Sequence, residues 1–110
     1  AEDPSDGFRP TPGRIREWRL PVGDGIRVDT HVQTGADVSP FYDSLLAKII
    51  ARGADRGEAI ARMIDALGEF SVAGVATTIP MHVAILSSVA FRDGSYDNRS
   101  IPGWPPAPMP

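Results

Sequence analysis

The fold of this chain is decided by residues 45–69, which read LLAKIIARGADRGEAIARMIDALGE. The first part, residues 45–51, is an apolar run interrupted only by Lys48. Its shortness and the Arg52-Gly53 stop that follows favour a buried β-strand, because a helix of this apolar character would need ten or more residues. The second part, from Asp55 onward, has apolar residues at the spacing of an α-helix.

The predicted helix begins after Asp55, which suits an N-cap, and Glu58 stands three positions on, as in a capping box. Apolar residues then recur at helical spacing, while the charged residues between them are free to face water. The apolar positions are Ile60, Met63, Ile64 and Leu67, and Gly68 lies near the end.

Two stretches upstream alternate between apolar and polar residues, which is typical of half-buried strands. They are residues 14–20 and residues 25–32, and the turn formers of residues 21–25 separate them. The sequence therefore predicts an antiparallel hairpin. In the second strand, Ile26 and Val28 would face the core, and Arg27, Asp29 and His31 would lie on the other face.

The downstream half adds a short strand at residues 70–72 and a second helix over residues 81–88, with Pro80 at its start. This order predicts an α+β fold with a mainly antiparallel sheet and two helices. Residues 102–110 read PGWPPAPMP and predict a Pro-rich tail or linker of polyproline type. We therefore expect one domain over residues 1–101, followed by that tail.

Composition excludes several classes of protein. The 110 residues match one domain and leave no room for a second catalytic one. A net charge of -3 lacks the basic excess that nucleic acid or an anionic membrane would require, and no apolar run approaches a membrane span. The chain has no cysteine, which excludes disulfides and thiolate metal sites and is compatible with a reducing, cytoplasmic compartment.

The inventory of reactive side chains is thin. His31 and His82 are too few and too far apart for a metal cluster, no serine stands in a nucleophile elbow, and no glycine-rich loop could cradle phosphates. Lys48 is the only lysine, and we interpret it as a strand residue whose stem covers apolar surface. The sequence thus predicts no catalytic residue and no metal ligand.

Asp43 is the most interesting acid, because it directly precedes the apolar run and could point into a cleft. A turn or capping aspartate explains the same position equally well. Both interpretations stay open on these residues alone.

Ordered blocks along residues 1–98 resemble the C-terminal domain of biotin carboxylase, the ATP-dependent component of acetyl-CoA, propionyl-CoA and related acyl-CoA carboxylases. The blocks are residues 1–4 (AEDP), 10–15 (PTPGRI), 25–29 (GIRVD), 42–50 (YDSLLAKII), 59–63 (AIARM), 74–80 (GVATTIP) and 91–97 (FRDGSYD).

The resemblance implies that the chain belongs with an N-terminal domain and an ATP-grasp domain, which in this family lie ahead of it. The complete subunit would carboxylate biotin on a carrier protein with ATP, magnesium and bicarbonate, and a carboxyltransferase would pass the carboxyl group on, as in fatty acid biosynthesis. The ATP lid and metal ligands lie in the other domains, so this chain alone should hold no cofactor and catalyse nothing. A free-standing, non-catalytic interaction module of the same fold is the alternative.

The resemblance also assigns supporting roles to four residues. Asp43 matches an aspartate near the biotin site, where a carboxylate can help to hold an arginine. Asn98 matches a position at the edge of the adenine pocket, and Asp24 and Arg27 match positions near a two-fold interface, which implies a homodimer of the complete subunit. The chain departs from the family pattern at Ser100 and Pro102.

Overall fold

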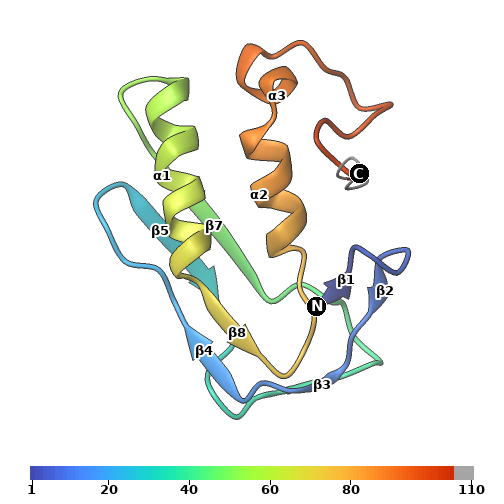
Figure 1. The fold of residues 1–110 in the computed structure, drawn as a ribbon. Coiled ribbons are helices and arrows are strands. Elements are labelled where there is room, and N and C mark those ends of the chain that lie inside the picture. The colour runs from blue at the N-terminus through green and yellow to red at the C-terminus, as the bar shows by residue number, and fades with distance from the viewer. Residues whose placement is uncertain (106–110) are drawn as a thin grey trace.

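The computed structural model describes residues 1–105 and arranges short antiparallel strand pairs beneath three helices (Figure 1). The strands are β1 (Glu2–Asp3), β2 (Arg9–Pro10), β3 (Gly13–Arg14), β4 (Glu17–Arg19), β5 (Ile26–Thr30), β6 (Asp37–Val38), β7 (Ala47–Ala51) and β8 (Ser71–Ala73). The helices are α1 (Arg56–Glu69), α2 (Ile79–Ser87) and α3 (Val89–Asp93). The α+β class with antiparallel strands is confirmed, and α3 is an addition to the two helices expected.

Strand pairing differs from the predicted hairpin, which is wrong. β4 pairs with β8, and β5 pairs with β7, so the two alternating stretches do not pair with each other. The reason is burial. Trp18 of β4 packs edge-on against Phe70, with ring centroids 5.0 Å apart, and this contact draws β4 to the strand that follows α1.

The β5–β7 ribbon confirms a strand within residues 45–51, but the strand is not buried as predicted, because alternate residues of β7 are exposed and Ile50 is 45% exposed. Its register pairs Ile26 with Ala51 and Val28 with Ile49. Ile26 and Val28 are half-buried, whereas Arg27 and Asp29 are exposed, as the alternation predicted. α1 lies across this ribbon in Figure 1 and contacts β7.

The start of α1 is capped as expected, because Asp55 Oδ1 accepts a hydrogen bond from the Glu58 N–H at 2.8 Å. The capping box expected from Glu58 is only half formed, because its carboxylate pairs with Arg62 at 2.7 Å, one helical turn later, and not with the Asp55 N–H. The helix ends at Phe70, whose N–H donates to the Ala66 carbonyl. The local signals therefore place both ends of α1.

The small core surrounds the inner face of α1. Its buried apolar side chains are Ile15, Val32, Ile60, Ala66, Leu67 and Phe70. Since they come from α1 and from loops on both sides of the strand pairs, the core joins segments that are far apart in the sequence.

The C-terminal helices are attached to α1 through Arg56. Its guanidinium lies 4.7 Å from the centroid of the Phe91 ring and donates from Nη2 to the Phe91 carbonyl at 2.6 Å. The Ser88 side chain caps α3, and Gly94, with φ 70°, ends it.

The predicted tail is described only in part. Within residues 102–105 there is no strand, and Gly103 approaches α2 so closely that a Cβ would lie 2.5 Å from the Ala84 carbonyl oxygen. Residues 106–110 lie outside the described residues. Among residues 1–105, none of the helices has the length and apolar character needed to cross a membrane.

Candidate functional site

An open apolar groove of about 910 Å³ lies between β7 and α2. One wall is β7 with the residues that lead into it, the floor includes Met63 and Leu67 of α1, and the opposite wall includes Ile85 and Leu86 of α2. Trp18 of β4 also lines the groove. Such a groove, lined by apolar side chains with few polar groups, is the form that ligand or partner sites take.

The polar groups of the groove gather where β7 begins. The Ala1 amine donates to the Ser44 carbonyl at 2.7 Å, and Ser44 Oγ donates to Glu2 Oε1 at 3.2 Å. Asp43 also lines this end. Across the groove, partial burial lowers the pKa of the His82 imidazole below its ordinary value.

Asp43 is both a turn residue and an exposed carboxylate. Its Oδ1 accepts a hydrogen bond from the Leu45 N–H at 2.7 Å, which is the Asx-turn geometry expected of a turn aspartate. Among the described residues, no partner binds Oδ2. One carboxylate oxygen therefore fixes the turn, and the other has no hydrogen-bond partner among the described residues, on a side chain that lines the groove.

The side chains next to Asp43 are exposed to an unusual degree. Phe41 is 89% exposed and Tyr42 is 83% exposed, although both are large and aromatic. Adjacent exposed aromatic side chains are typical of a surface that a partner covers. The sequence analysis did not identify them as such.

Arg27 lies on the outer face of the β5–β7 ribbon, away from the groove. Its Nε and Nη2 donate to the two carboxylate oxygens of Asp29 at 3.0 and 2.9 Å, which makes a bidentate pair. Asp24 is exposed in the turn that precedes β5. Both residues are available to a partner on this face.

The pairing of Arg27 with Asp29 predicts a pKa shift that can be measured. The hydrogen bonds from Arg27 lower the pKa of Asp29, with a smaller contribution from the charge of Lys48 opposite it. Arg27→Gln should raise the pKa of Asp29 back toward its ordinary value, as read from its side-chain carbon shift in an NMR titration. The stabilisation from this depressed pKa is present above the unfolded-state pKa and is lost as the pH falls through the folded-state pKa. An unchanged Asp29 titration in the variant would mean that the two side chains do not pair in solution.

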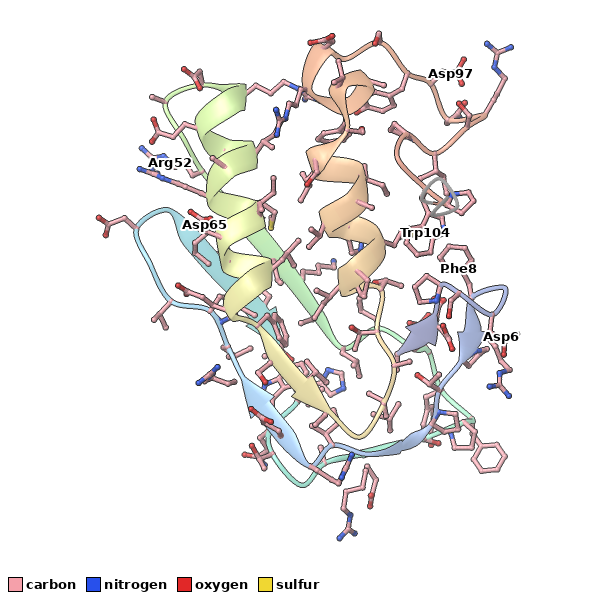
Figure 2. All side chains as sticks on the ribbon, in the orientation of Figure 1. Asp6, Phe8, Arg52, Asp65, Asp97 and Trp104 are labelled. Carbon is pink, nitrogen blue, oxygen red and sulfur yellow. The ribbon has the colours of Figure 1, made fainter. Side chains whose placement is uncertain are left out.

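Asn98 lies in a third place, in the exposed turn between Asp97 and Arg99. A shallow hollow nearby is lined by Gly94, Ser95, Tyr96, Asp97 and Ser100, and Asn98 is not among its lining residues. Figure 2 shows Asp97 on the far side of α2 and α3 from Arg52, which follows β7. The structure thus distributes the four predicted site residues over three separate surfaces.

The groove itself was missed by the sequence analysis. Met63 and Leu67 were assigned to a helix face that packs on a core, yet both also line this open groove. The spacing of apolar residues in a sequence does not distinguish a helix face that is covered from one that is not.

Among residues 1–105, no group of three His, Cys, Asp or Glu side chains could hold a metal ion.

Comparison with known proteins matches almost the whole chain to one family. The sequence profile described as "Biotin carboxylase C-terminal domain" matches residues 1–102. The pyruvate carboxylase of Methanothermobacter thermautotrophicus includes one polypeptide that is 50% identical over 94 residues, which are 86% of this chain and 19% of that polypeptide. Biotin carboxylase 1 of Bacillus subtilis is 44% identical over 99 residues, which are 90% of this chain and 22% of that protein.

Solved structures agree with the sequence matches. The biotin carboxylase domain dimer of the Hydrogenobacter thermophilus 2-oxoglutarate carboxylase, in complex with MgADP, ADP and bicarbonate, superposes with a TM-score of 0.88 at 41% identity. The superposition covers 90% of this chain and 22% of that one. The chain therefore spans about a fifth of the length of these relatives.

Proposed function

Because the chain belongs to the biotin carboxylase C-terminal domain family, we propose that it serves as the C-terminal domain of a subunit that carboxylates biotin with ATP and bicarbonate. The observation that carries this proposal is the match in sequence and fold along residues 1–102 to biotin carboxylases. The whole subunit is an ATP-dependent ligase, and this chain supplies the supporting part of it.

The donor set of the described residues does not fit magnesium or ATP. Residues 1–105 contain no group of three metal-binding side chains, and the sequence has no phosphate-binding loop. We therefore assign nucleotide and metal contacts to the N-terminal and ATP-grasp domains, with Asn98 at most at the edge of the adenine site. No chemical step is assigned to this chain.

The residue that we place nearest the chemistry is Asp43. The Leu45 N–H holds one carboxylate oxygen, so the other has a fixed direction and can accept a hydrogen bond from a guanidinium at the biotin site. Holding that cation in place would orient it toward the biotin ureido group. Asp43 is thus a positioning residue.

Biotin would arrive on a carrier protein, and a carboxyltransferase would choose the final acceptor. The relatives named above are carboxylases of pyruvate and of 2-oxoglutarate, as well as a biotin carboxylase without a named acceptor. An acyl-CoA acceptor, as in fatty acid biosynthesis, and a cytoplasmic location stay predictions. The absence of cysteine is compatible with a reducing compartment.

The test is a chimaera in which this chain replaces the matching fifth of Bacillus subtilis biotin carboxylase 1. We expect ATP-dependent carboxylation of free biotin, whereas the same relative without that fifth should be inactive. The 110-residue chain alone should show no bicarbonate-dependent ATP hydrolysis, because the groups that stabilise phosphoryl transfer lie elsewhere. Turnover by the chain alone would contradict the proposal, and a folded but inactive chimaera would favour the interaction module instead.

We also propose that Arg27 and Asp24 lie at a two-fold interface of the complete subunit. The relative from Hydrogenobacter is a dimer, and the Arg27 side chain is exposed on the β5–β7 ribbon, which supports this placement. Arg27→Glu in the chimaera should weaken the dimer about 10-fold or more, since like charges would then meet across the axis.

Sedimentation velocity over a range of concentrations measures that change. Arg14→Glu is the matched control, because Arg14 is equally exposed and also paired with an aspartate, Asp37. A dimer that is weakened equally by both substitutions, or by neither, would remove Arg27 from the interface.

A further inference from the structure

The chain that leaves α3 folds back onto α2 and contacts it through Gly103. This glycine has φ 75°, and a Cβ on it would lie 2.5 Å from the Ala84 carbonyl oxygen and 3.1 Å from the Ser88 Cβ. Ala84 lies in α2, and Ser88 is the cap residue between α2 and α3. Figure 1 shows the returning segment on the side of α2 that faces away from α1. Because the approach is so close and φ is positive, the contact requires glycine.

The other end of the intervening loop is attached to α3. The Tyr96 ring stacks on the Phe91 ring, with centroids 5.2 Å apart, and the Ser95 N–H donates to the Ala90 carbonyl at 3.0 Å. Phe91 and Ala90 both belong to α3. Residues 97–102 therefore form a loop whose two ends are held near the junction of α2 and α3.

The tip of this loop has a defined shape around Asn98. Asp97 Oδ1 accepts a hydrogen bond from the Arg99 N–H at 2.9 Å, and Asp97 Oδ2 accepts one from Arg99 Nε at 2.9 Å. Asn98 is exposed between these two residues. Among the described residues, no hydrogen bond joins residues 97–102 to α2 or α3. The direction in which the tip points is therefore set by the attachment of its two ends.

Resting on the proposed function, we infer that Gly103 is a positioning residue for nucleotide binding. Its contact with α2 docks the chain that follows Asn98 and, together with the stacked Tyr96, closes the loop and holds Asn98 at the edge of the adenine site. Because the loop is already closed, a nucleotide does not have to order it on binding. The family profile ends at residue 102, so this attachment lies outside the part of the chain that the profile matches.

The first measurement compares Gly103→Ala with the unchanged chain, each placed in the chimaera. Trypsin cleavage between Arg99 and Ser100, followed by mass spectrometry, reports how often the loop opens. We expect this cleavage to be about 10-fold faster in Gly103→Ala, because the added Cβ pushes the segment away from α2. Cleavage after Arg62, which lies in α1, reports wider unfolding and should not change.

The second measurement is the kinetics of the same variant. Gly103→Ala should raise the KM for ATP about 5-fold to 10-fold, while kcat for biotin carboxylation changes by less than about 2-fold. A contact at the adenine edge is made equally in the ground state and the transition state, so its loss weakens binding and leaves the chemical step unchanged. A merely structural role for Gly103 would not separate the two constants in this way.

Gly35→Ala is the matched control, because Gly35 has φ 87° but open space around its Cβ position. It introduces backbone strain in the turn before β6 and should leave both the cleavage after Arg99 and the KM for ATP unchanged. Gly103→Asn should behave like Gly103→Ala. Asparagine tolerates a positive φ, but its Cβ meets the same Ala84 carbonyl oxygen.

Unchanged cleavage after Arg99 in Gly103→Ala would overturn the inference, because the loop would then not depend on this contact. Faster cleavage with an unchanged KM for ATP would overturn the role of Gly103 in nucleotide binding. An inactive chimaera would contradict the proposed function and that role with it. The cleavage assay does not depend on activity, so a failed attachment and a failed function are told apart.

Discussion

Replacing Gly74 with alanine should lower the free energy of unfolding by about 3 kcal/mol or more, a large part of the stability of a domain this size. Gly74 follows β8 with φ 113°, a conformation that residues with a Cβ rarely adopt. A Cβ there would overlap the Arg14 carbonyl oxygen and lie 3.1 Å from the Arg16 nitrogen. The strand that carries Trp18 would have to move away from β8, and the hydrogen bond from Arg16 to the Ala73 carbonyl would be lost.

Substitutions at two other glycines separate backbone strain from steric overlap in this loss of stability. Gly35 has φ 87° but open space around its Cβ position, so Gly35→Ala should cost only the backbone strain of about 1–2 kcal/mol. Gly68 lies in α1 with nothing within 4 Å, and Gly68→Ala should stabilise the protein by up to about 1 kcal/mol. Urea unfolding followed by tryptophan fluorescence measures all three. Equal losses for Gly35→Ala and Gly74→Ala would mean that the close approach of β8 to Arg14 is absent in solution.

Signals within a few residues of the sequence were enough to predict the strand β7 and the helix α1. The Asp55 cap, the apolar spacing after it and the Arg52-Gly53 stop each act within a few residues, and the structure confirms the strand and the helix that they predicted. The alternation of apolar and polar residues also predicted correctly which side chains of β5 are half-buried and which are exposed. These features depend on the backbone period and on capping, which a sequence displays directly.

Strand pairing could not be predicted in the same way. The stretch before β5 has turn formers that suit a hairpin, but Trp18 gains more by packing on Phe70, a residue fifty-two positions away. Burial between distant segments outweighs a favourable turn, and no local pattern records the distant partner. The same limit hid the groove, because the side chains of α1 and α2 that line it have the spacing of ordinary core residues.

The second large effect concerns Asp43. In the chimaera, Asp43→Asn should lower the rate of biotin carboxylation about 10-fold to 100-fold, which corresponds to ~1.4–2.7 kcal/mol of transition-state stabilisation. Asparagine keeps an oxygen that can accept from the Leu45 N–H, so the turn survives. The charge that would hold a guanidinium at the biotin site is lost. Biotin-independent ATP hydrolysis, which reports formation of carboxyphosphate, should change much less.

Asp65→Asn is the matched control, because it removes an exposed carboxylate from α1 at a position that does not line the groove (Figure 2). It should leave both rates unchanged. A positioning role also predicts that Asp43→Asn lowers kcat for biotin without a fall in Tm, since the turn and the fold remain. If carboxylation stays at the wild-type rate, or falls only together with Tm, then Asp43 is a turn aspartate alone, and the cation at the biotin site is held by other groups.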